Sequence, residues 1–300
     1  MIRFAFTDKY LYYLPEGHRF PIEKYELVKQ QLVHEGTIEE AQVFDPGLVE
    51  EGHILAVHDA SYWEALKTLS LDKKAVRKIG LPVTATSVNR ARSSVAGTMA
   101  AAINALDAGA GANLAGGTHH AYRGHGEGFC ALNDIAITAR YMLDEHHIDQ
   151  VLVIDLDVHQ GNGTAHIFKD EPKVFTFSMH GAGNYPMHKE QSDLDVELPS
   201  GTGDEAYLEV LSHHLEVLFQ TVQPSLVFYQ SGVDVLASDR LGKLALTREG
   251  ARERDKLVIS HCHSGQIPLV VTMGGGYSQK LTDLIDAHCN TFRTLMTYYS

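Results

Sequence analysis

Residues 151–163 read Val-Leu-Val-Ile-Asp-Leu-Asp-Val-His-Gln-Gly-Asn-Gly, an apolar run that ends in two carboxylates and an imidazole at alternate positions. A β-strand projects alternate side chains to one face, so Asp155, Asp157 and His159 form one polar row if the strand persists to its end. The Gly-Asn-Gly that follows is a turn signal. The sequence therefore predicts this row at the carboxyl end of a buried strand, where parallel α/β sheets carry their active sites.

The row contains the ligand types of a metal site. Ions of the zinc type bind imidazole nitrogen and carboxylate oxygen, and a further carboxylate commonly orients a ring beside them. The same residues also fit a strand end whose carboxylates accept hydrogen bonds from loop amides. The row alone leaves both interpretations open.

The composition limits the class of protein. The chain has 300 residues, of which 44% are hydrophobic and 21% charged, enough to bury a large core. Its formal net charge of -13, without a basic patch, argues against direct binding of nucleic acid. No run approaches the roughly 18 apolar residues of a membrane span. We therefore expect neither a nucleic-acid partner nor a membrane.

Cysteine usage indicates the compartment. Cys130, Cys262 and Cys289 lie far apart and are odd in number, so they suggest neither a disulfide framework nor a Cys-x-x-Cys metal site. Residues 1–8 read as a first strand rather than as a signal peptide. The expected location is the cytoplasm.

Strand and helix candidates alternate along the chain. Six continuous apolar runs, typical of strands buried on both faces, are residues 2–6, 112–115, 151–158, 174–179, 225–229 and 268–273. Helical patterns cover residues 21–34, 61–69, 87–108, 132–147, 205–221, 248–263 and 280–297. No linker or repeat divides them. We predict an α/β fold, a single domain over residues 1–300 with a central, mostly parallel sheet between two layers of helices. The turn-rich stretch 181–203 is a candidate active-site loop.

Adjacent histidines follow another predicted strand. Residues 114–134 begin with an apolar pair and two glycines, and then bring His119 and His120 into a glycine-rich loop. Two adjacent histidines on the polar face of a helix would need no functional explanation, but this pair follows a buried strand and two glycines. We expect both rings to face a cleft.

Two further strands also end in polar or glycine-rich loops. In residues 227–242 the loop holds Asp234 and Asp239, and Asp239 lies farther beyond the strand, free to reach a metal held by the first row. Both acids also fit turn caps, and Asp239 has Arg240 as an alternative partner. Residues 270–278 contain three glycines without a Lys-Ser/Thr sequel or Gly-x-Gly-x-x-Gly spacing, which favours a loop presenting Tyr277 over a nucleotide cradle.

Together these segments resemble the histone deacetylase family, within the wider arginase and deacetylase fold. The matching segments, in the family's order, are residues 117–120 (Gly-Thr-His-His), 128–134 (Gly-Phe-Cys-Ala-Leu-Asn-Asp), 155–164 (Asp-Leu-Asp-Val-His-Gln-Gly-Asn-Gly-Thr), 232–242 (Gly-Val-Asp-Val-Leu-Ala-Ser-Asp-Arg-Leu-Gly) and 274–277 (Gly-Gly-Gly-Tyr). The segments 155–163 and 238–242 are most similar to class IV deacetylases and their bacterial relatives.

The resemblance implies a metal site and a second cation. Asp157, His159 and Asp239 would hold one divalent ion per chain, zinc or alternatively iron(II), and leave positions open for water and substrate. A potassium site would use Asp155 and backbone oxygens near Asp157, His159, Ser178 and Met179.

It also implies a division of catalytic roles. His120 would act as general base, and His119, oriented by Asp155, would stabilise charge and protonate the leaving amine. Tyr277 would donate its hydroxyl to the oxyanion. Asn162 stands where several relatives carry an aspartate, so we expect His120 to be less basic here than beside a carboxylate.

The resemblance further implies a tunnel for an acyl-lysine-like chain. Gly128, Phe129 and Tyr185 would line it, although residues 181–186 depart from the Phe-Pro-Gly pattern of other classes. The expected partner is an acylated lysine in a peptide or protein, or an acylated small amine.

Three other functions remain as alternatives. The acidic composition and short chain fit a small-molecule deacetylase of the acetylpolyamine type as readily as a protein deacetylase, but this chain has no room for the large extra loop common in enzymes of that type. An arginase-type enzyme with two manganese ions needs Asp-x-His-x-Asp on the central strand, whereas this chain has Asp-x-Asp-x-His. An acyl-ligand sensor without catalysis would not require the complete set of ligands, histidines and tyrosine.

Overall fold

The sheet that carries the predicted motifs has eight strands. The computed structural model describes residues 1–300, and every strand pairing in it is parallel, in the order β2-β1-β3-β8-β7-β4-β5-β6. The strands are β1 (Phe4–Ala5), β2 (Val43–Phe44), β3 (Ala110–Asn113), β4 (Val151–Asp155), β5 (Val174–Gly181), β6 (Leu194–Leu198), β7 (Leu226–Gln230) and β8 (Leu269–Thr272). The predicted α/β fold with a parallel sheet is confirmed.

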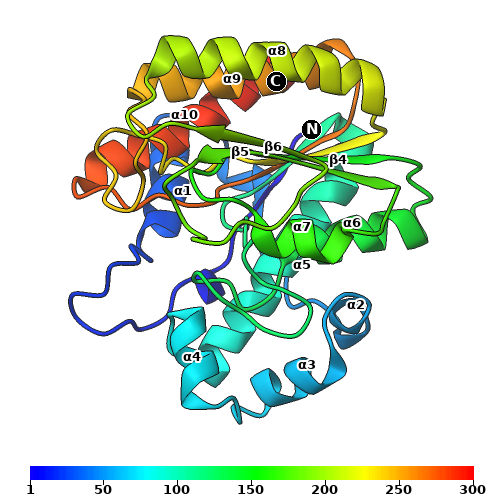
Figure 1. Cartoon of the computed structure of the whole chain (residues 1–300), viewed down its shortest axis with the longest axis vertical. Coiled ribbons are helices and arrows are strands. Elements are labelled where there is room, and N and C mark those ends of the chain that lie inside the picture. Colours follow the sequence, from blue (N-terminus) through cyan, green and yellow to red (C-terminus); the bar gives the residue numbers. More distant parts are fainter.

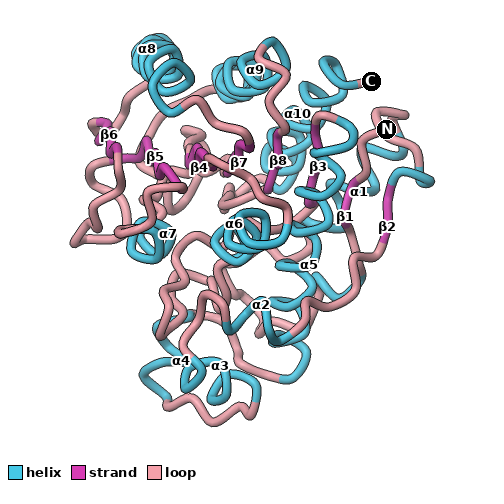
Figure 2. Tube along the Cα trace, turned by 90° about the vertical axis from the view of Figure 1, so that its right-hand side faces the viewer, coloured by secondary structure: helices cyan, strands magenta, loops and turns pink.

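Helices cover both faces of this sheet. They are α1 (Lys24–His34), α2 (Glu51–Leu55), α3 (Ala60–Lys67), α4 (Lys73–Ile79), α5 (Ala85–Ala108), α6 (Asp134–Glu145), α7 (Asn162–Phe168), α8 (Asp204–Val222), α9 (Arg248–Ser264) and α10 (Leu281–Tyr299). Figures 1 and 2 show α8, α9 and α10 on one side of the sheet and α5, α6 and α7 on the other, with α2, α3 and α4 beyond α5. None of the helices is long and apolar enough to cross a bilayer.

Local sequence explains where the longer elements begin and end. The five residues of β4 and the five of β7 are all buried, as expected for strands covered on both faces. Helix α5 is capped at its N-terminus by Thr84, whose hydroxyl accepts from the amide of Ser87, and at its C-terminus by Gly109 in the left-handed conformation. The side chains between the layers form one hydrophobic cluster of 77 buried residues.

Some short elements differ from the predictions. Strand β2 and helices α2, α4 and α7 have between two and seven residues, too few to carry a readable period. Within the stretch 181–203, predicted as a loop, β6 pairs with β5 and forms one edge of the sheet. Strand β4 ends at Asp155 rather than continuing to Val158, so the polar row does not lie on a strand throughout.

Four central strands end at the same level. The register pairs Asn113 of β3 with Thr272 of β8, Thr272 with Gln230 of β7, and Gln230 with Asp155 of β4. The loops that follow these four strands therefore leave the sheet side by side at its carboxyl edge. This edge is where parallel α/β sheets bind ligands.

Candidate active site

Three buried side chains converge beyond β4 and β7. His159 Nδ1 lies 3.0 Å from Asp157 Oδ1 and 3.2 Å from Asp234 Oδ2. One ligand atom from each of the three residues lies within 4.8 Å of the others, so the group has the geometry of a metal site. Asp234 Oδ2 is buried and has no hydrogen-bond partner, which leaves a full acceptor facing His159 and Asp157.

The donor set fits a divalent ion of the zinc type. In a tetrahedral zinc site with metal–ligand bonds of about 2.0–2.1 Å, two ligand atoms lie about 3.3 Å apart. The distances from His159 Nδ1 to the oxygens of Asp157 and Asp234 are close to this value. Burial and then the charge of Asp157 raise the pKa of Asp234 to about 7. A bound cation would relieve this concentration of buried negative charge.

Asp239, predicted as the third ligand, is not part of this group, and its place is taken by Asp234. Asp239 Oδ1 accepts hydrogen bonds from the amides of Leu241 and Gly242, and Oδ2 accepts one of 2.6 Å from the amide of Tyr277. Both carboxylate oxygens therefore anchor loops. The structure corrects the prediction: Asp239 holds the backbone that presents Tyr277.

Turns formed by carboxylates position the rest of the polar row. The amide of Asp157 donates to Asp155 Oδ1 at 3.2 Å, and the amide of His159 donates to Asp157 Oδ1 at 3.0 Å. Each carboxylate thus caps the amide two residues ahead, as Asp does in local turns. The two interpretations of the row are compatible, because the side chains that cap this loop are also two of the candidate ligands.

His119 is paired with a carboxylate. Its Nδ1 lies 2.6 Å from Asp155 Oδ2, and both residues are buried. Burial by itself lowers the pKa of His119, but the charges of Asp155 and Asp157 outweigh burial and raise the pKa to about 9. This ring is therefore suited to carry a positive charge.

His120 is paired with an amide. Its Nδ1 lies 2.6 Å from Asn162 Oδ1, and Asn162 Nδ2 donates at 2.7 Å to Glu127 Oε1. An ionised carboxylate only accepts, so the NH₂ of Asn162 must face Glu127 and its oxygen must face His120. His120 Nδ1 consequently carries the hydrogen and Nε2 is left as an acceptor. Burial, followed by the charges of His119 and His159, lowers the pKa of His120 well below its ordinary value.

Glu127 is a residue that the sequence analysis missed. It is only 4% exposed, and besides Asn162 it accepts from Tyr185 Oη at 2.5 Å and Lys78 Nζ at 2.6 Å. Burial raises the pKa of Glu127, but these donors and His125 outweigh it and hold the pKa well below the ordinary value. The available signal was a lone acid between Gly126 and Gly128 in a loop rich in histidine and glycine.

Tyr277 follows the glycines after β8. The amide of Gly275 donates to Asp157 Oδ2 at 2.8 Å, and a Cβ at Gly275 would overlap the carboxylate oxygens of Asp234 and Asp157. Glycine therefore allows the backbone to approach the candidate ligands. Burial and the charges of Asp234 and Asp157 raise the pKa of Tyr277 well above its ordinary value, so its hydroxyl stays protonated.

A cavity of about 240 Å³ leads to these groups. His120, His159 and Tyr277 line it together with all three predicted tunnel residues, Gly128, Phe129 and Tyr185. The rings of Phe129 and Tyr277 lie 5.7 Å apart, and those of His120 and Tyr185 lie 5.1 Å apart. A Cβ at Gly128 would overlap the ring of His120, so the backbone passes close to this imidazole only because residue 128 is glycine.

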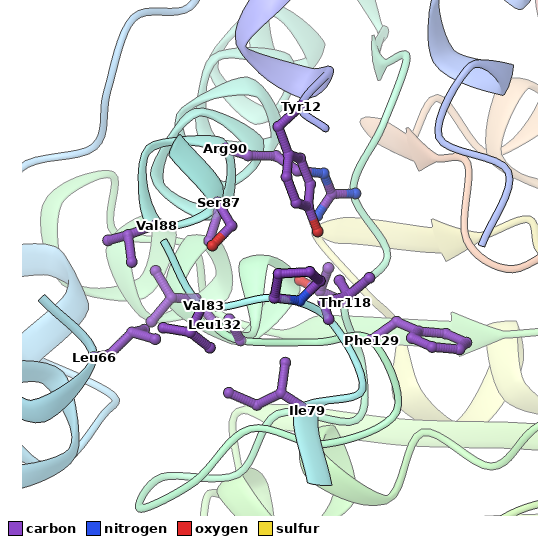
Figure 3. A pocket seen from close by; sticks show the side chains of 14 residues that line it. Tyr12, Leu66, Ile79, Val83, Ser87, Val88, Arg90, Thr118, Phe129 and Leu132 are labelled. Carbon is purple, nitrogen blue, oxygen red and sulfur yellow. The ribbon is translucent and has the colours of Figure 1, made fainter. Parts of the chain in front are cut away.

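A second cavity is also lined by Phe129. Figure 3 shows Phe129 at its border, with Arg90 and Val88 of α5 and Ile79 of α4. Its volume of about 20 Å³ holds little more than one water molecule. Of the two cavities that Phe129 lines, only the larger has room for a substrate chain.

The residues predicted for a monovalent cation lie on neighbouring strands. Asp155 pairs in register with Ser178, and Met179 follows on β5. The hydroxyl of Ser178 lies 3.0 Å from His180 Nδ1. The assignment of potassium to these residues stays a prediction.

The chain is similar to several known proteins. A family model described as the histone deacetylase domain matches residues 18–292. An uncharacterized protein of Picosynechococcus sp. is 45% identical over 295 residues, covering 98% of each chain. Histone deacetylase 2 of Arabidopsis thaliana is 32% identical over 89% of this chain and 72% of its own length. The acetoin utilization protein AcuC of Staphylococcus aureus is 29% identical over 91% of this chain and 76% of its own length.

The fold has a close match among solved structures. The crystal structure of the HDA15 HD domain superimposes with a TM-score of 0.83, covering 99% of this chain and 88% of the other, at 20% sequence identity. This match supports the arrangement of sheet and helices.

Proposed function

This chain belongs to the histone deacetylase family, and we propose that it removes an acetyl or longer acyl group from acylated lysine in proteins by metal-dependent hydrolysis. The observation that carries the proposal is the buried group Asp157, His159 and Asp234 beside two histidines with different partners. We treat residues 1–300 as one catalytic domain. We expect it to act in the cytoplasm, which its free cysteines favour.

We assign one divalent ion, zinc or iron(II), to Asp157, His159 and Asp234. When bound, such an ion polarises the substrate carbonyl and lowers the pKa of a water molecule beside it. Ser178 and Met179, with Asp155 and the backbone of the following loop, are the candidates for potassium. These assignments rest on the donor atoms and on the unpartnered oxygen of Asp234.

The two histidines divide the proton transfers. His120 is held by a neutral amide, and its Nε2 is free to take a proton from the attacking water. His119 is held by the carboxylate of Asp155, which favours the imidazolium, so we assign it charge stabilisation and proton donation to the leaving amine. Because the rings lie 4.0 Å apart, each senses the charge of the other.

Tyr277 completes the proposed reaction. Its hydroxyl makes no hydrogen bond within the protein, while its backbone is fixed by Asp239 and Arg240. A protonated phenol held in this way can donate to the carbonyl oxygen as it gains negative charge. Phe129 and Tyr185 would enclose the alkyl chain of the acylated lysine.

A substrate panel tests the proposal. The protein, loaded with zinc or iron(II), is assayed on acetyl-lysine peptides, long-chain acyl-lysine peptides and acetylpolyamines, with and without a hydroxamate inhibitor. We expect hydroxamate-sensitive turnover of acyl-lysine that is lost in Asp157→Asn and retained in Asp107→Asn, an exposed matched control on α5. Turnover of none of the substrates, or turnover that survives Asp157→Asn, would refute it.

A further inference from the structure

The mouth of the catalytic cavity is positively charged. Arg19, Arg77 and Lys78 line the cavity together with the imidazoles of His120 and His159, and no carboxylate lines it. We call Arg19, Arg77 and Lys78 the cationic mouth. In the whole chain, acidic residues outnumber Lys and Arg by 38 to 25. The sign of charge at the mouth is therefore opposite to that of the protein.

Two of the three cations have no carboxylate partner in the protein. Lys78 pairs with Glu127 at 2.6 Å, which partly compensates its charge. Arg19 and Arg77 form no ion pair, whereas the exposed Arg248 and Arg252 both pair with carboxylates. Two guanidinium groups thus remain available to a ligand at the mouth.

The structure of the mouth keeps these charges near the path of the substrate. Arg77 and Lys78 occupy the last turn of α4, which ends at Gly80 in the left-handed conformation. The guanidinium of Arg19 lies 5.2 Å from the ring centroid of Phe129, the wall of the predicted tunnel. A group that projects from the mouth would meet positive charge from two separate segments.

Helix electrostatics do not explain the whole pattern. Cations in the last turn of a helix are favoured by the helix dipole, which accounts for Arg77 and Lys78. Arg19 precedes α1 and belongs to no helix, yet it faces the same cavity. The shared feature of the three residues is the cavity that they line.

We propose that the cationic mouth selects acyl-lysine flanked by aspartate or glutamate in a peptide. This inference rests on the proposed deacylase function and specifies its substrate class. A carboxylate beside the acyl-lysine would meet Arg19 and Arg77, whereas a lysine-rich peptide or an acetylpolyamine would bring positive charge against them. The mouth therefore disfavours the acetylpolyamine alternative.

The expected effect is moderate because the arginines are exposed. Pairs of this kind change binding by about 1.5- to 5-fold each, so the two arginines together should give about 10-fold in KM. The charge preference should decrease when NaCl is raised from 0.1 to 1 M, since the Debye length falls from about 10 Å to about 3 Å.

Three matched peptides test the inference. They differ only in the residues on both sides of the acetyl-lysine, which are glutamate, glutamine or lysine. We expect the glutamate peptide to have the lowest KM and the lysine peptide the highest, with similar kcat values. In Arg19→Gln/Arg77→Gln the ratio of KM values between the glutamine and glutamate peptides should fall about 10-fold. Arg19→Lys/Arg77→Lys should retain the preference, as should Arg252→Gln on the exposed surface of α9.

The outcomes separate this inference from the proposed function. Turnover of the glutamine peptide without a preference for glutamate over lysine would overturn the inference and leave the deacylase function standing. A preference that persists in Arg19→Gln/Arg77→Gln, or faster turnover of acetylspermidine than of the glutamate peptide, would also overturn it. Absence of turnover on every peptide would instead refute the function on which it rests.

Discussion

The contact between Asn162 and Glu127 makes a quantitative prediction about why residue 162 is an amide. Asn162 is 1% exposed and Glu127 is 4% exposed, and the nitrogen of the first lies 2.7 Å from the carboxylate oxygen of the second. In Asn162→Asp this donor becomes a second carboxylate. Two unit charges at 2.7 Å repel by about 6 kcal/mol at an effective dielectric constant of 20.

Protonation limits this cost. Placing a proton on a carboxylate with a pKa near 4 costs about 4 kcal/mol at pH 7, less than the repulsion, so one of the two groups should bind a proton. The folded state then has a carboxyl pKa above that of the unfolded state, and the deficit in stability is largest at high pH. Asn162→Asp should therefore lose about 4 kcal/mol at pH 7 and about 1 kcal/mol at pH 5.

A second substitution should rescue the first. In Asn162→Asp/Glu127→Gln the glutamine amide can donate to the new carboxylate, and the loss of the Lys78 pair costs little because the Lys78 side chain is 48% exposed. We expect a coupling energy of about 3 kcal/mol, measured by urea denaturation of the four proteins at pH 7. In the double variant the acidic limb of the pH profile of kcat/KM should also move upward, because a carboxylate then contacts His120.

Asn290→Asp provides the matched control. Asn290 Oδ1 accepts from Arg293, so the same substitution there should not destabilise the protein. The reasoning is refuted if Asn162→Asp is as stable as the parent at pH 7. It is also refuted if Glu127→Gln fails to restore stability to Asn162→Asp.

Three further predictions follow from the site and from the core. Asp234→Asn should reduce bound zinc, measured by mass spectrometry, from one ion per chain to a small fraction, whereas Asp239→Asn should keep the ion and lose activity; the opposite pattern would restore Asp239 as the ligand. Tyr277→Phe should lower kcat by about 10²-fold or more with little change in KM, because it removes one oxyanion donor, and a smaller loss would exclude that role. Burial lowers the pKa of His58 to about 4 from the ordinary 6.5, so unfolding binds a proton and stability should fall as pH drops from 6.5 to 4, by about 3 kcal/mol in total. His58→Gln should remove that part of the pH dependence in denaturation curves, and an unchanged slope would contradict it.

The long elements were predictable because their stabilising contacts follow a repeating pattern. Strands β4 and β7 are continuous apolar runs, and α5 and α10 repeat their apolar residues with a helical period. Strand β2 has two residues and exists because it pairs with β1. Elements of that length depend on tertiary contacts and leave no periodic signal.

The candidate site was predictable in its parts and less so in its assembly. His119, His120, Asp157, His159 and Tyr277, all predicted site residues, line one small cavity of about 30 Å³. The choice between the two acids of the loop after β7 required the fold. The loop brings the carboxylate of Asp234 to His159, whereas the carboxylate of Asp239 accepts hydrogen bonds from three backbone amides. The two acids are only five residues apart, in a region without a periodic pattern that could distinguish them.

The sequence by itself determined the layered fold and the chemical groups at the carboxyl edge, because strand ends and loop glycines are local properties. The tertiary structure alone decided which carboxylate joins Asp157 and His159. It also decided that Glu127, 35 residues before Asn162, sets the orientation of the amide on His120. Tertiary structure likewise gathers three cations at one cavity of a protein whose net charge is -13. The physical reason is the same in each case: hydrogen bonds and local electrostatic potentials depend on distances in space, not on separation along the chain.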